Sequence, residues 1–222
     1  MSGRRVFAIL GGTGPFGRGL ARALAAGGAE VVIGSRNAER AREVARQLRA
    51  VGGPQLDIRS GTNAQAAVSG NPVFLALPFA AQEGVLRAAA PVLDDRLVIC
   101  CGVIWPPGSR PGTSASEEAA RVLRDAGAAR GRVAAAFQTI AAGLLAEELP
   151  PIPDRPDVLV FADRAGDRKE AAEAAAVTGL PAVEAGPLAG SRVAEAALGV
   201  LIGLNRRGAA RHAGLRVTGR TS

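Results

Sequence analysis

Residues 5–17 read RVFAILGGTGPFG, an apolar run that leads directly into a glycine-rich turn. The apolar run predicts a short buried strand, and apolar residues at helical spacing begin at Phe16. Short apolar runs and helical segments continue to alternate along the chain, which is typical of right-handed crossovers around a parallel sheet. We therefore expect an α/β fold with a doubly wound parallel sheet.

The expected elements follow one another along the whole chain. Strands are expected at residues 5–10, 30–34, 55–58, 73–77, 97–101, 132–137, 157–161 and 182–185. Helices are expected at residues 16–26, 38–50, 64–68, 80–89, 114–126, 167–177 and 191–205. Because residues 149–156 are rich in proline, we expect one domain over residues 1–148 and a small C-terminal α/β part over residues 149–222.

The turn contains Gly12-Thr13-Gly14-Pro15-Phe16-Gly17, which fits the pattern G-x-G-x-x-G. Short glycine patterns arise by chance, but this one follows a strand and opens a helix, as in Rossmann-type dinucleotide-binding domains. Gly12 would allow the tight turn, Gly14 would let the backbone approach a pyrophosphate, and Gly17 would let the helix pack on the sheet. The N-terminus of the helix would face the phosphates, and Thr13 could add a hydroxyl donor. The alternative is a turn whose glycines serve packing only.

The end of the second expected strand indicates which dinucleotide binds. NAD sites usually place Asp or Glu there to accept hydrogen bonds from the ribose 2′-hydroxyl. This chain has Gly34-Ser35-Arg36 instead, and its next acid is Glu39. Arg36 can stack on adenine and neutralise a 2′-phosphate, Ser35 can donate to it, and Arg40 follows one helical turn later. The residues therefore predict NADP(H), with a solvated arginine at a helix start as the alternative reading of Arg36.

The charge of the chain suits small anionic ligands. Its formal net charge is +7, but the arginines are scattered and aromatic residues make up only 3% of the chain, which argues against a nucleic-acid surface. No polybasic amphipathic stretch indicates a membrane surface, and the apolar run Val193–Leu204 is too short to cross a bilayer. The adjacent Cys100 and Cys101 are expected as buried thiols of a cytoplasmic protein, because their spacing suits neither a metal site nor an unstrained disulfide.

The residue types that are missing restrict the chemistry. Dehydrogenases of alcohols and ketones need a proton donor or acceptor at the oxygen, commonly Tyr, His or Lys. The chain has no tyrosine, one histidine and one lysine. We expect His212, in the basic tail, to be exposed and not catalytic, with a tail that folds over the site as the alternative, and we expect Lys169 on a solvated helix face away from the cofactor. A second redox ring would need no strong protein acid, because hydride can pass directly between two stacked rings.

The stretch from Ile9 to Leu20, followed by Val32-Ile33-Gly34-Ser35-Arg36, closely resembles the NADPH-dependent reductases of the deazaflavin coenzyme F420. The likeness continues in order through residues 75–78 (LALP), 138–140 (QTI) and 186–192 (GPLAGSR). The resemblance implies an oxidoreductase that transfers hydride between NADPH and coenzyme F420. It also implies an NADP-binding Rossmann domain and a small C-terminal part, with the deazaflavin in the cleft between them.

The resemblance implies which residues surround the two cofactors. Contacts to NADP are implied for Thr13, Ser35, Arg36 and Arg40. Further cofactor contacts are expected from Gly12, Gly14, Pro15, Phe16, Gly17, Leu77, Gln138 and Ala141. Pro78 and Ile140 would position the nicotinamide and deazaflavin rings, and no residue is assigned as a proton donor or acceptor. Arg192 would meet the anionic second ligand or brace the last helix.

The chain departs from the family pattern on the side of the second substrate. Gln138 stands where the family has His before Thr-Ile, and Ala196 and Leu198 stand where its last helix has Ser and Thr. Three hypotheses stay open: hydride exchange with coenzyme F420, reduction of another ring such as a pterin or a flavin, and a non-catalytic NADP-binding sensor. The apolar helix at residues 193–204 is either a core helix or the contact of a homodimer, and the dimer is supported only by the resemblance.

Overall fold

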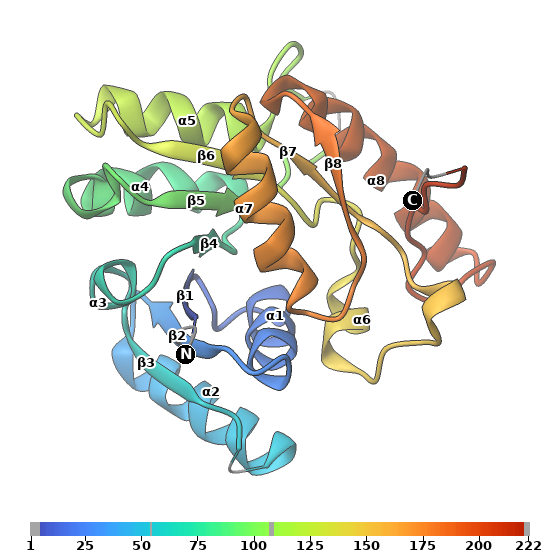
Figure 1. Cartoon of the computed structure of the whole chain (residues 1–222), viewed down its shortest axis with the longest axis horizontal. Coiled ribbons are helices and arrows are strands. Elements are labelled where there is room, and N and C mark those ends of the chain that lie inside the picture. Colours follow the sequence, from blue (N-terminus) through green and yellow to red (C-terminus); the bar gives the residue numbers. More distant parts are fainter. Residues whose placement is uncertain (1–4, 54, 107–108, 220–222) are drawn as a thin grey trace.

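In a computed structural model, helices flank both faces of an eight-stranded sheet (Figure 1). The structure describes residues 5–53, 55–106 and 109–219. The strand order is β3-β2-β1-β4-β5-β6-β7-β8, and all neighbouring pairs run parallel except β6 and β7. The strand order reverses between β1 and β4, and ligands of open α/β sheets bind at such a reversal, outside the carboxyl ends of the strands. The expected α/β fold of the Rossmann type is therefore confirmed.

The central strands β4 and β5 are wholly buried. The strands are β1 (Val6–Leu10), β2 (Glu30–Ser35), β3 (Ile58–Thr62), β4 (Val73–Leu75), β5 (Leu97–Cys100), β6 (Arg132–Ala135), β7 (Val158–Phe161) and β8 (Ala182–Gly186). The helices are α1 (Pro15–Ala26), α2 (Ala38–Gly52), α3 (Asn63–Ser69), α4 (Phe79–Leu93), α5 (Ala115–Asp125), α6 (Ala142–Ala146), α7 (Ala165–Ala176) and α8 (Ser191–Arg206). Two short 3-10 turns, Ile152–Asp154 and Leu188–Gly190, complete the described elements.

Alternate residues of the central strands enter two separate cores. Phe7 and Ile9 of β1 pack in the core that includes α1, α2 and α7, whereas Ala8 and Leu10 pack in the core that includes α3, α4 and α5. This division follows from the two-residue repeat of a strand. Both faces of the sheet are covered, which explains why its strands read as continuous apolar runs in the sequence.

The C-terminal strands extend the same sheet. β6 pairs antiparallel with β7 through Ala135 and Phe161, and β8 then adds in parallel to β7. The tail after α8 returns to the beginning of β7, where the Asp157 N–H donates to the Leu215 carbonyl oxygen at 2.8 Å. The predicted division into residues 1–148 and 149–222 falls where the strand direction reverses. That residues 1–148 and residues 149–222 have separate functions stays a prediction.

Two local expectations differ from the structure. The third strand occupies Ile58–Thr62 and not residues 55–58. As an edge strand it tolerates exposed polar residues, so its sequence carries little apolar signal. The helix α6 was not expected, because five residues are too few to show a helical repeat. It packs against α1, where a methyl group on Gly19 would lie 3.1 Å from the Ala142 carbonyl oxygen.

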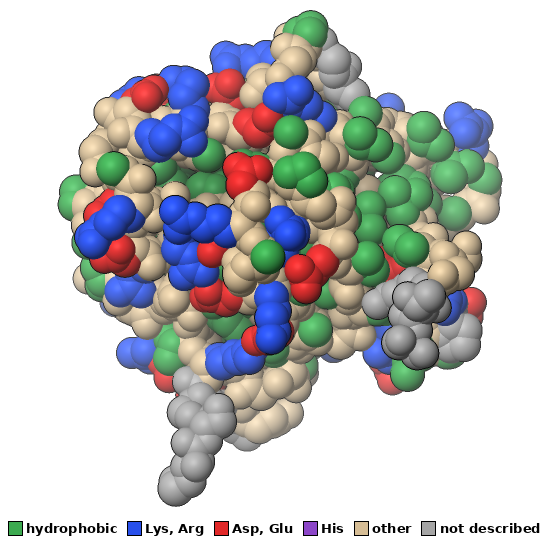
Figure 2. Space-filling model, turned by 45° about the horizontal axis from the view of Figure 1, so that its top comes forward, with side chains coloured by type: hydrophobic (Ala, Val, Ile, Leu, Met, Phe, Trp, Pro, Cys, Tyr) green, Lys and Arg blue, Asp and Glu red, His purple; other side chains and the backbone are tan. Residues whose placement is uncertain are grey.

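The last helical segment is longer than its apolar run suggested. Leu188–Arg206 spans 19 residues with a mean hydropathy of 1.2, long and apolar enough by length and composition to cross a membrane. We expected the apolar run to be too short to cross a bilayer, and the length of the helical segment differs from that expectation. In the fold, Ser191 and Glu195 of this segment are buried and bond to α5 and the loop before it. Its outer face carries Val193 and Val200, which are 74% and 64% exposed, and Figure 2 shows hydrophobic side chains gathered on this side of the molecule.

Candidate functional site

The turn between β1 and α1 is held by backbone bonds and by one side chain from α3. Gly11 has φ +79°, a left-handed conformation that favours glycine, and its N–H donates to Asn63 Oδ1 at 3.2 Å. The Gly12 N–H donates to the Gly34 carbonyl oxygen at 3.0 Å and fastens the turn to β2. The glycine that the tight turn requires is therefore Gly11. Gly12, predicted for that role, is instead needed for close packing, since a methyl group there would lie 2.8 Å from Ile33 Cγ2.

The other two glycines of the motif differ in their surroundings. A methyl group added at Gly17 would lie 2.6 Å from Cα of Gly12, so glycine is needed for α1 to pack this close to the turn. A methyl group at Gly14 would meet no described protein atom nearer than the Gly11 carbonyl oxygen, at 3.9 Å. Gly14 is also the N-cap of α1, and it has no side chain to cap the helix. Internal packing explains Gly17 but not Gly14, whose open surroundings suit phosphates at a helix N-terminus.

A cavity of about 670 Å³ opens beside this turn, at the carboxyl ends of the central strands. Its walls come from the turn, from the loops that follow β4, β5 and β6, from α8 and from the tail. Among the residues expected at the cofactors, those lining the cavity are Gly14, Pro15, Phe16, Gly17, Leu77, Pro78, Gln138, Ile140 and Ala141. The fold thus brings expected site residues that are far apart in the sequence, from Gly14 to Ala141, to the wall of the same cavity.

The cavity offers shape and apolar contact but no side-chain acid or base. The described residues that line it include no Lys, Arg, His, Asp or Glu. Burial raises the pKa of the lining Cys101 thiol well above its usual value and that of the neighbouring Cys100 to about 11, so both stay protonated at neutral pH. Both cysteines are free and buried, as expected. Among the residues that the structure describes, no group of three His, Cys, Asp or Glu side chains could hold a metal ion.

Gln138 lines the cavity, and its side chain carries a buried hydrogen-bond acceptor that has no partner among the described residues. The residue is 3% exposed, and its Nε2 donates to the Cys100 carbonyl oxygen at 2.9 Å. That bond fixes the orientation of the amide, and its Oε1 finds no partner in the described part of the chain. A buried acceptor left unpaired costs about 1–3 kcal/mol. Because Oε1 is itself buried, an N–H group of a bound molecule would reach it only after the side chain or its surroundings move.

The backbone turns sharply just before Gln138. Phe137 has φ +74°, a conformation that costs a non-glycine residue about 1–3 kcal/mol. Its buried ring packs edge-on against Phe74 and Phe16, at centroid distances of 6.2 and 6.1 Å. This packing holds the turn after β6, and the turn carries the next side chain into the cavity wall. Strain of this kind concentrates at functional sites.

A second hollow, of about 520 Å³, adjoins the end of β2. It is lined by Ser35 and Arg36, by Thr62 and Asn63 at the start of α3, and by small residues of α4. The Ser35 hydroxyl oxygen accepts the Asn37 N–H at 3.2 Å, which leaves its own hydrogen free to donate to a ligand. No described carboxylate lines this hollow. It therefore suits an anionic group at the place where the sequence predicted a 2′-phosphate.

The remaining two residues expected at NADP line a separate groove of about 540 Å³. Thr13 and Arg40 meet there with Arg18 and Arg22 of α1. Arg18 is held by the Gln47 side chain, and Arg22 donates to the Glu147 carbonyl oxygen at 3.0 Å. The four predicted NADP residues are thus divided between two hollows on either side of the β2 end, and both hollows are cationic.

Arg192 lies outside the cavity. Its Nε and Nη2 donate to the two carboxylate oxygens of Glu117 at 2.7 and 2.5 Å, which joins α8 to α5. The same ion pair holds the pKa of Glu117 below its usual range. Of the two roles expected for Arg192, the geometry matches bracing of the last helix and does not match a ligand contact. Leu198 lines the cavity, whereas Ala196 is exposed and is not among its lining residues.

The tail folds back toward the cavity, although its sequence showed no pattern. The Ala213 N–H donates to Asn205 Oδ1 at 2.8 Å, and both residues line the cavity. His212 is only 24% exposed, and its Nε2 lies 3.4 Å from Glu147 Oε1, so the expected exposed histidine is wrong. Neither His212 nor the exposed Lys169 is among the cavity-lining residues.

Sequence reasoning missed three contributors to the site. Trp105 lines the cavity from a proline-rich loop after β5, and its place at the carboxyl end of a strand was a usable signal. Asn63 and Ala213 reach the site only because α3 and the tail pack beside it. Nothing in their local sequence indicates that placement.

Comparisons with known families agree with this geometry. The model of the family described as NADP oxidoreductase, coenzyme F420-dependent, matches residues 6–103, from β1 to the loop after β5. A protein named F420-dependent NADP reductase from Methanothermobacter thermautotrophicus is 38% identical, over 95% of this chain and 94% of its own. A protein of the same name from Methanocaldococcus jannaschii is 30% identical, over 95% of this chain and 97% of its own.

Solved structures show the same fold. The crystal structure of a candidate F420-dependent NADP reductase from Arthrobacter sp. FB24 superposes with a TM-score of 0.75 at 22% identity. The match covers 97% of this chain and 100% of that chain. A reductive aminase from Aspergillus terreus, solved with NADPH, reaches a TM-score of 0.61 at 20% identity over 93% of this chain and 63% of its own.

Proposed function

Because the chain belongs to the coenzyme F420-dependent NADP reductase family, we propose that it is an oxidoreductase that transfers hydride between NADP(H) and coenzyme F420. One observation carries the proposal: the cavity joins the glycine-rich turn at the N-terminus of α1 to an apolar space without a side-chain acid or base among its described lining residues. Its volume of about 670 Å³ is typical of small-molecule and cofactor sites. Hydride transfer between two rings needs that combination, since no oxygen has to be protonated in step with it.

The glycine turn and the end of β2 are proposed to hold NADP(H). Gly14 leaves space for the pyrophosphate at the N-terminus of α1. Ser35 and Arg36 line the hollow proposed for the adenosine end, where no described carboxylate would repel a 2′-phosphate. Thr13 and Arg40 are proposed to reach the same phosphate from the neighbouring groove. The nicotinamide end would then lie in the cavity, near Pro78 and Ile140.

The cavity residues are proposed to align the rings. When bound, NADPH supplies a hydride and the deazaflavin supplies the ring carbon that accepts it. Pro78, Ile140 and Leu198 offer apolar surface to planar rings, and they exclude water from between them. Gln138 lines the same cavity, and the bond from its Nε2 to the Cys100 carbonyl oxygen holds this part of the wall in place beside the rings. The protein's contribution is therefore positioning, with no proton held by a lining side chain.

An absorbance assay tests this proposal. The protein is mixed with NADPH and oxidised F420, and the deazaflavin absorbance is followed. Loss of that absorbance at a rate proportional to enzyme concentration is the expected result. Absence of turnover, in a preparation shown to bind NADPH, would contradict it.

A second candidate keeps NADP(H) and changes the acceptor. It is favoured by the acceptor side of the cavity, which is lined by Gln138 and Leu198 at positions where the resemblance implied His and a polar residue. Such a wall could suit another planar ring, of the pterin or flavin class. The same assay run with those rings distinguishes the two, because F420 turnover should exceed theirs under the first proposal.

We also propose a cytoplasmic homodimer. Two free buried cysteines suit a reducing compartment. The exposed apolar face of α8 around Val193 and Val200 suits a second copy of the chain. Light scattering tests the assembly: Val200→Glu should lower the measured mass to that of a monomer, whereas a monomeric unsubstituted protein would contradict it.

A further inference from the structure

The cavity has one wall whose position depends on a loop. The loop between β5 and α5 contributes Gly102, Val103 and Trp105 to the cavity. The facing wall is formed by Leu198, Leu201 and Ile202 of α8. A contact that fastens this loop to α8 therefore affects the shape of the cavity between the loop and the helix.

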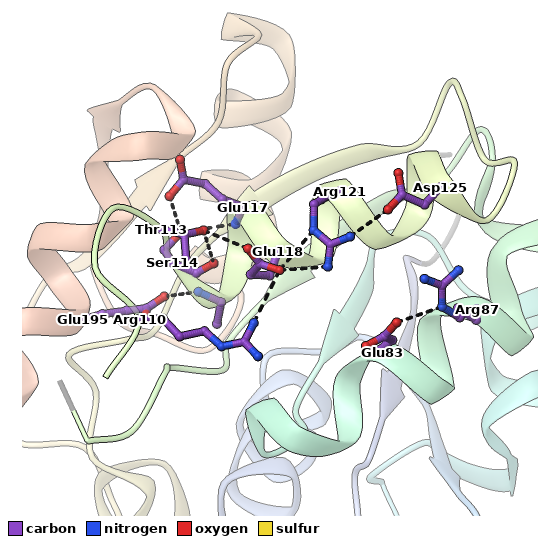
Figure 3. Close-up of polar contacts among 11 residues, drawn as sticks. Glu83, Arg87, Arg110, Thr113, Ser114, Glu117, Glu118, Arg121, Asp125 and Glu195 are labelled. Atoms are coloured by element: carbon purple, nitrogen blue, oxygen red, sulfur yellow. Dashed lines mark hydrogen bonds and ion pairs between the residues drawn. The ribbon is translucent and has the colours of Figure 1, made fainter. Parts of the chain in front are cut away.

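Glu195 makes that connection. Its side chain comes from α8 and is 6% exposed. Oε2 accepts the N–H of Ile104, between two cavity-lining residues, at 2.9 Å. Oε1 accepts the N–H of Ala115, the first residue of α5, at 2.8 Å (Figure 3). One carboxylate therefore holds the loop near its beginning, at Ile104, and also holds the first residue of the helix that follows the loop.

The carboxylate has no cationic partner among the described residues. Arg192, one turn earlier on α8, is engaged by Glu117 of α5, and Arg110 of the loop lies 3.8 Å from Glu118. Cys100 of β5 stays an uncharged thiol because burial raises its pKa to about 11. A buried charge held only by backbone N–H groups is costly, and a neutral acceptor such as Gln could not satisfy both donors.

We propose that Glu195 is a positioning residue for the cavity, and that only its ionised form holds the β5–α5 loop against α8. Protonation turns one oxygen into an O–H group that faces an N–H donor, so one of the two bonds is lost. The loop segment with Val103 and Trp105 then moves away from α8, and the cavity loses its shape for a planar ring. The contact thereby makes ligand binding depend on pH.

The expected pH range is close to neutrality. Burial raises the pKa of Glu195 to about 7, the two backbone N–H groups lower it, and the nearby charge of Glu117 raises it. The ionised fraction therefore falls as the pH drops through about 7. One pH unit below the midpoint about a tenth of the carboxyl is ionised, so an apparent affinity that needs the ionised form weakens about tenfold.

Trp105 allows a test that does not require enzyme activity. It is the chain's only tryptophan, follows Ile104 directly and is 49% exposed. Its fluorescence in the unliganded protein is recorded from about pH 5 to about pH 9. We expect a sigmoidal change with a midpoint near the pKa of Glu195. No change across this range in the unsubstituted protein would overturn the proposal.

Two substitutions test whether Glu195 is the group that causes the change in Trp105 fluorescence. Glu195→Gln should abolish it, while a transition that persists unchanged would overturn the proposal. Glu117→Gln is the matched control, because it removes the acid whose charge acts on Glu195 and leaves both Glu195 bonds in place. It should keep the transition and move its midpoint to lower pH, since the charge of Glu117 raises the pKa of Glu195. A midpoint that stays fixed would argue against Glu195 as the titrating group.

Amide hydrogen exchange provides a measurement on the unsubstituted protein, in case Glu195→Gln does not fold. The Ile104 and Ala115 amides should lose protection below the midpoint, beyond the intrinsic pH dependence of exchange, while amides of β4 keep theirs. Equal protection on both sides of the midpoint would contradict the proposal.

The consequence for catalysis rests on the proposed function. The KM for F420 should rise about tenfold from one pH unit above the midpoint to one unit below it, with a smaller change in kcat. The proposed hydride transfer and the proposed role of Glu195 can be contradicted independently of each other. A Trp105 transition without turnover would contradict the proposed function alone, and turnover without the transition would contradict the role of Glu195 alone.

Discussion

The two sides of the cavity are built differently. On the side proposed for the nucleotide, a continuous turn of the chain supplies Gly11, Gly14 and Gly17, and the end of the adjacent strand β2 supplies Ser35, which lines the neighbouring hollow. On the acceptor side, the wall is assembled from the loop after β5, the turn after β6, α8 and the tail. The first side depends on local backbone geometry, whereas the second depends on packing between segments far apart in the sequence.

This difference separates the chemistry that each side controls. Under the proposed function, the turn and the β2 end would decide which dinucleotide binds, and their residues are constrained by the fold itself. The acceptor wall would decide which ring receives the hydride, and Gln138, Trp105 and Leu198 there can change while the sheet stays intact. Substitutions on the two sides should therefore affect different binding constants.

The largest expected effect is that of Gly14→Val. The methyl groups would enter the space proposed for the pyrophosphate, so NADPH and NADH should both bind at least about a hundredfold more weakly, a loss of ~2.7 kcal/mol. The melting temperature should change little, because a methyl group there lies 3.9 Å from the nearest described protein atom. Titration calorimetry and thermal unfolding check the two parts.

Gly17→Ala is the control for that substitution. Its methyl group would lie 2.6 Å from Cα of Gly12, so it should lower the free energy of unfolding by about 1–3 kcal/mol. Unchanged cofactor binding in Gly14→Val would move the phosphate site away from this turn. A large fall in its melting temperature would show that Gly14 serves packing.

Arg36→Ala should have the next largest effect. Losing a charged hydrogen bond to the 2′-phosphate should weaken NADPH binding by about 1.5–3 kcal/mol, while NADH binding changes much less. The difference between the two dissociation constants is the quantity to measure. Equal losses for both cofactors would show that the β2 end does not select NADP.

Gln138→Leu should have the smallest effect, and only on the acceptor side. It removes the bond to the Cys100 carbonyl oxygen, so the KM for F420 should rise by a factor equivalent to about 0.5–1.5 kcal/mol. The dissociation constant of NADPH should stay the same. A change in NADPH binding with an unaltered KM for F420 would reverse the assignment of the two sides.

The sequence predicted the side of the site that depends on local backbone geometry better than the side that depends on packing between distant segments. The strand-turn-helix at residues 5–17 predicted the sheet and the phosphate turn, because periodicity and glycine spacing are local. Even there it assigned the tight turn to Gly12, since only backbone angles reveal that Gly11 has the positive φ. Arg192 was expected either to meet the second ligand or to brace the last helix, and the sequence could not decide between them because its ion pair with Glu117 depends on how α8 meets α5.

The acceptor wall could not be predicted from the sequence, for a physical reason. The free oxygen of Gln138 results from a bond to a carbonyl oxygen 38 residues away and from the strained turn at Phe137. The place of Ala213 results from the return of the tail along α8. Neither contact has a periodic or compositional signal, so a likeness to known families was needed to expect a second substrate there.

Direct hydride transfer within the cavity is the central claim, and an isotope measurement tests it most directly. NADPH that carries deuterium at the transferable position of its nicotinamide ring is incubated with the protein and oxidised F420 in ordinary water, and the reduced F420 is analysed by mass spectrometry. The account predicts one deuterium in the reduced deazaflavin ring. Reduced F420 without deuterium, or NADPH binding with no reduced F420 at all, would contradict it.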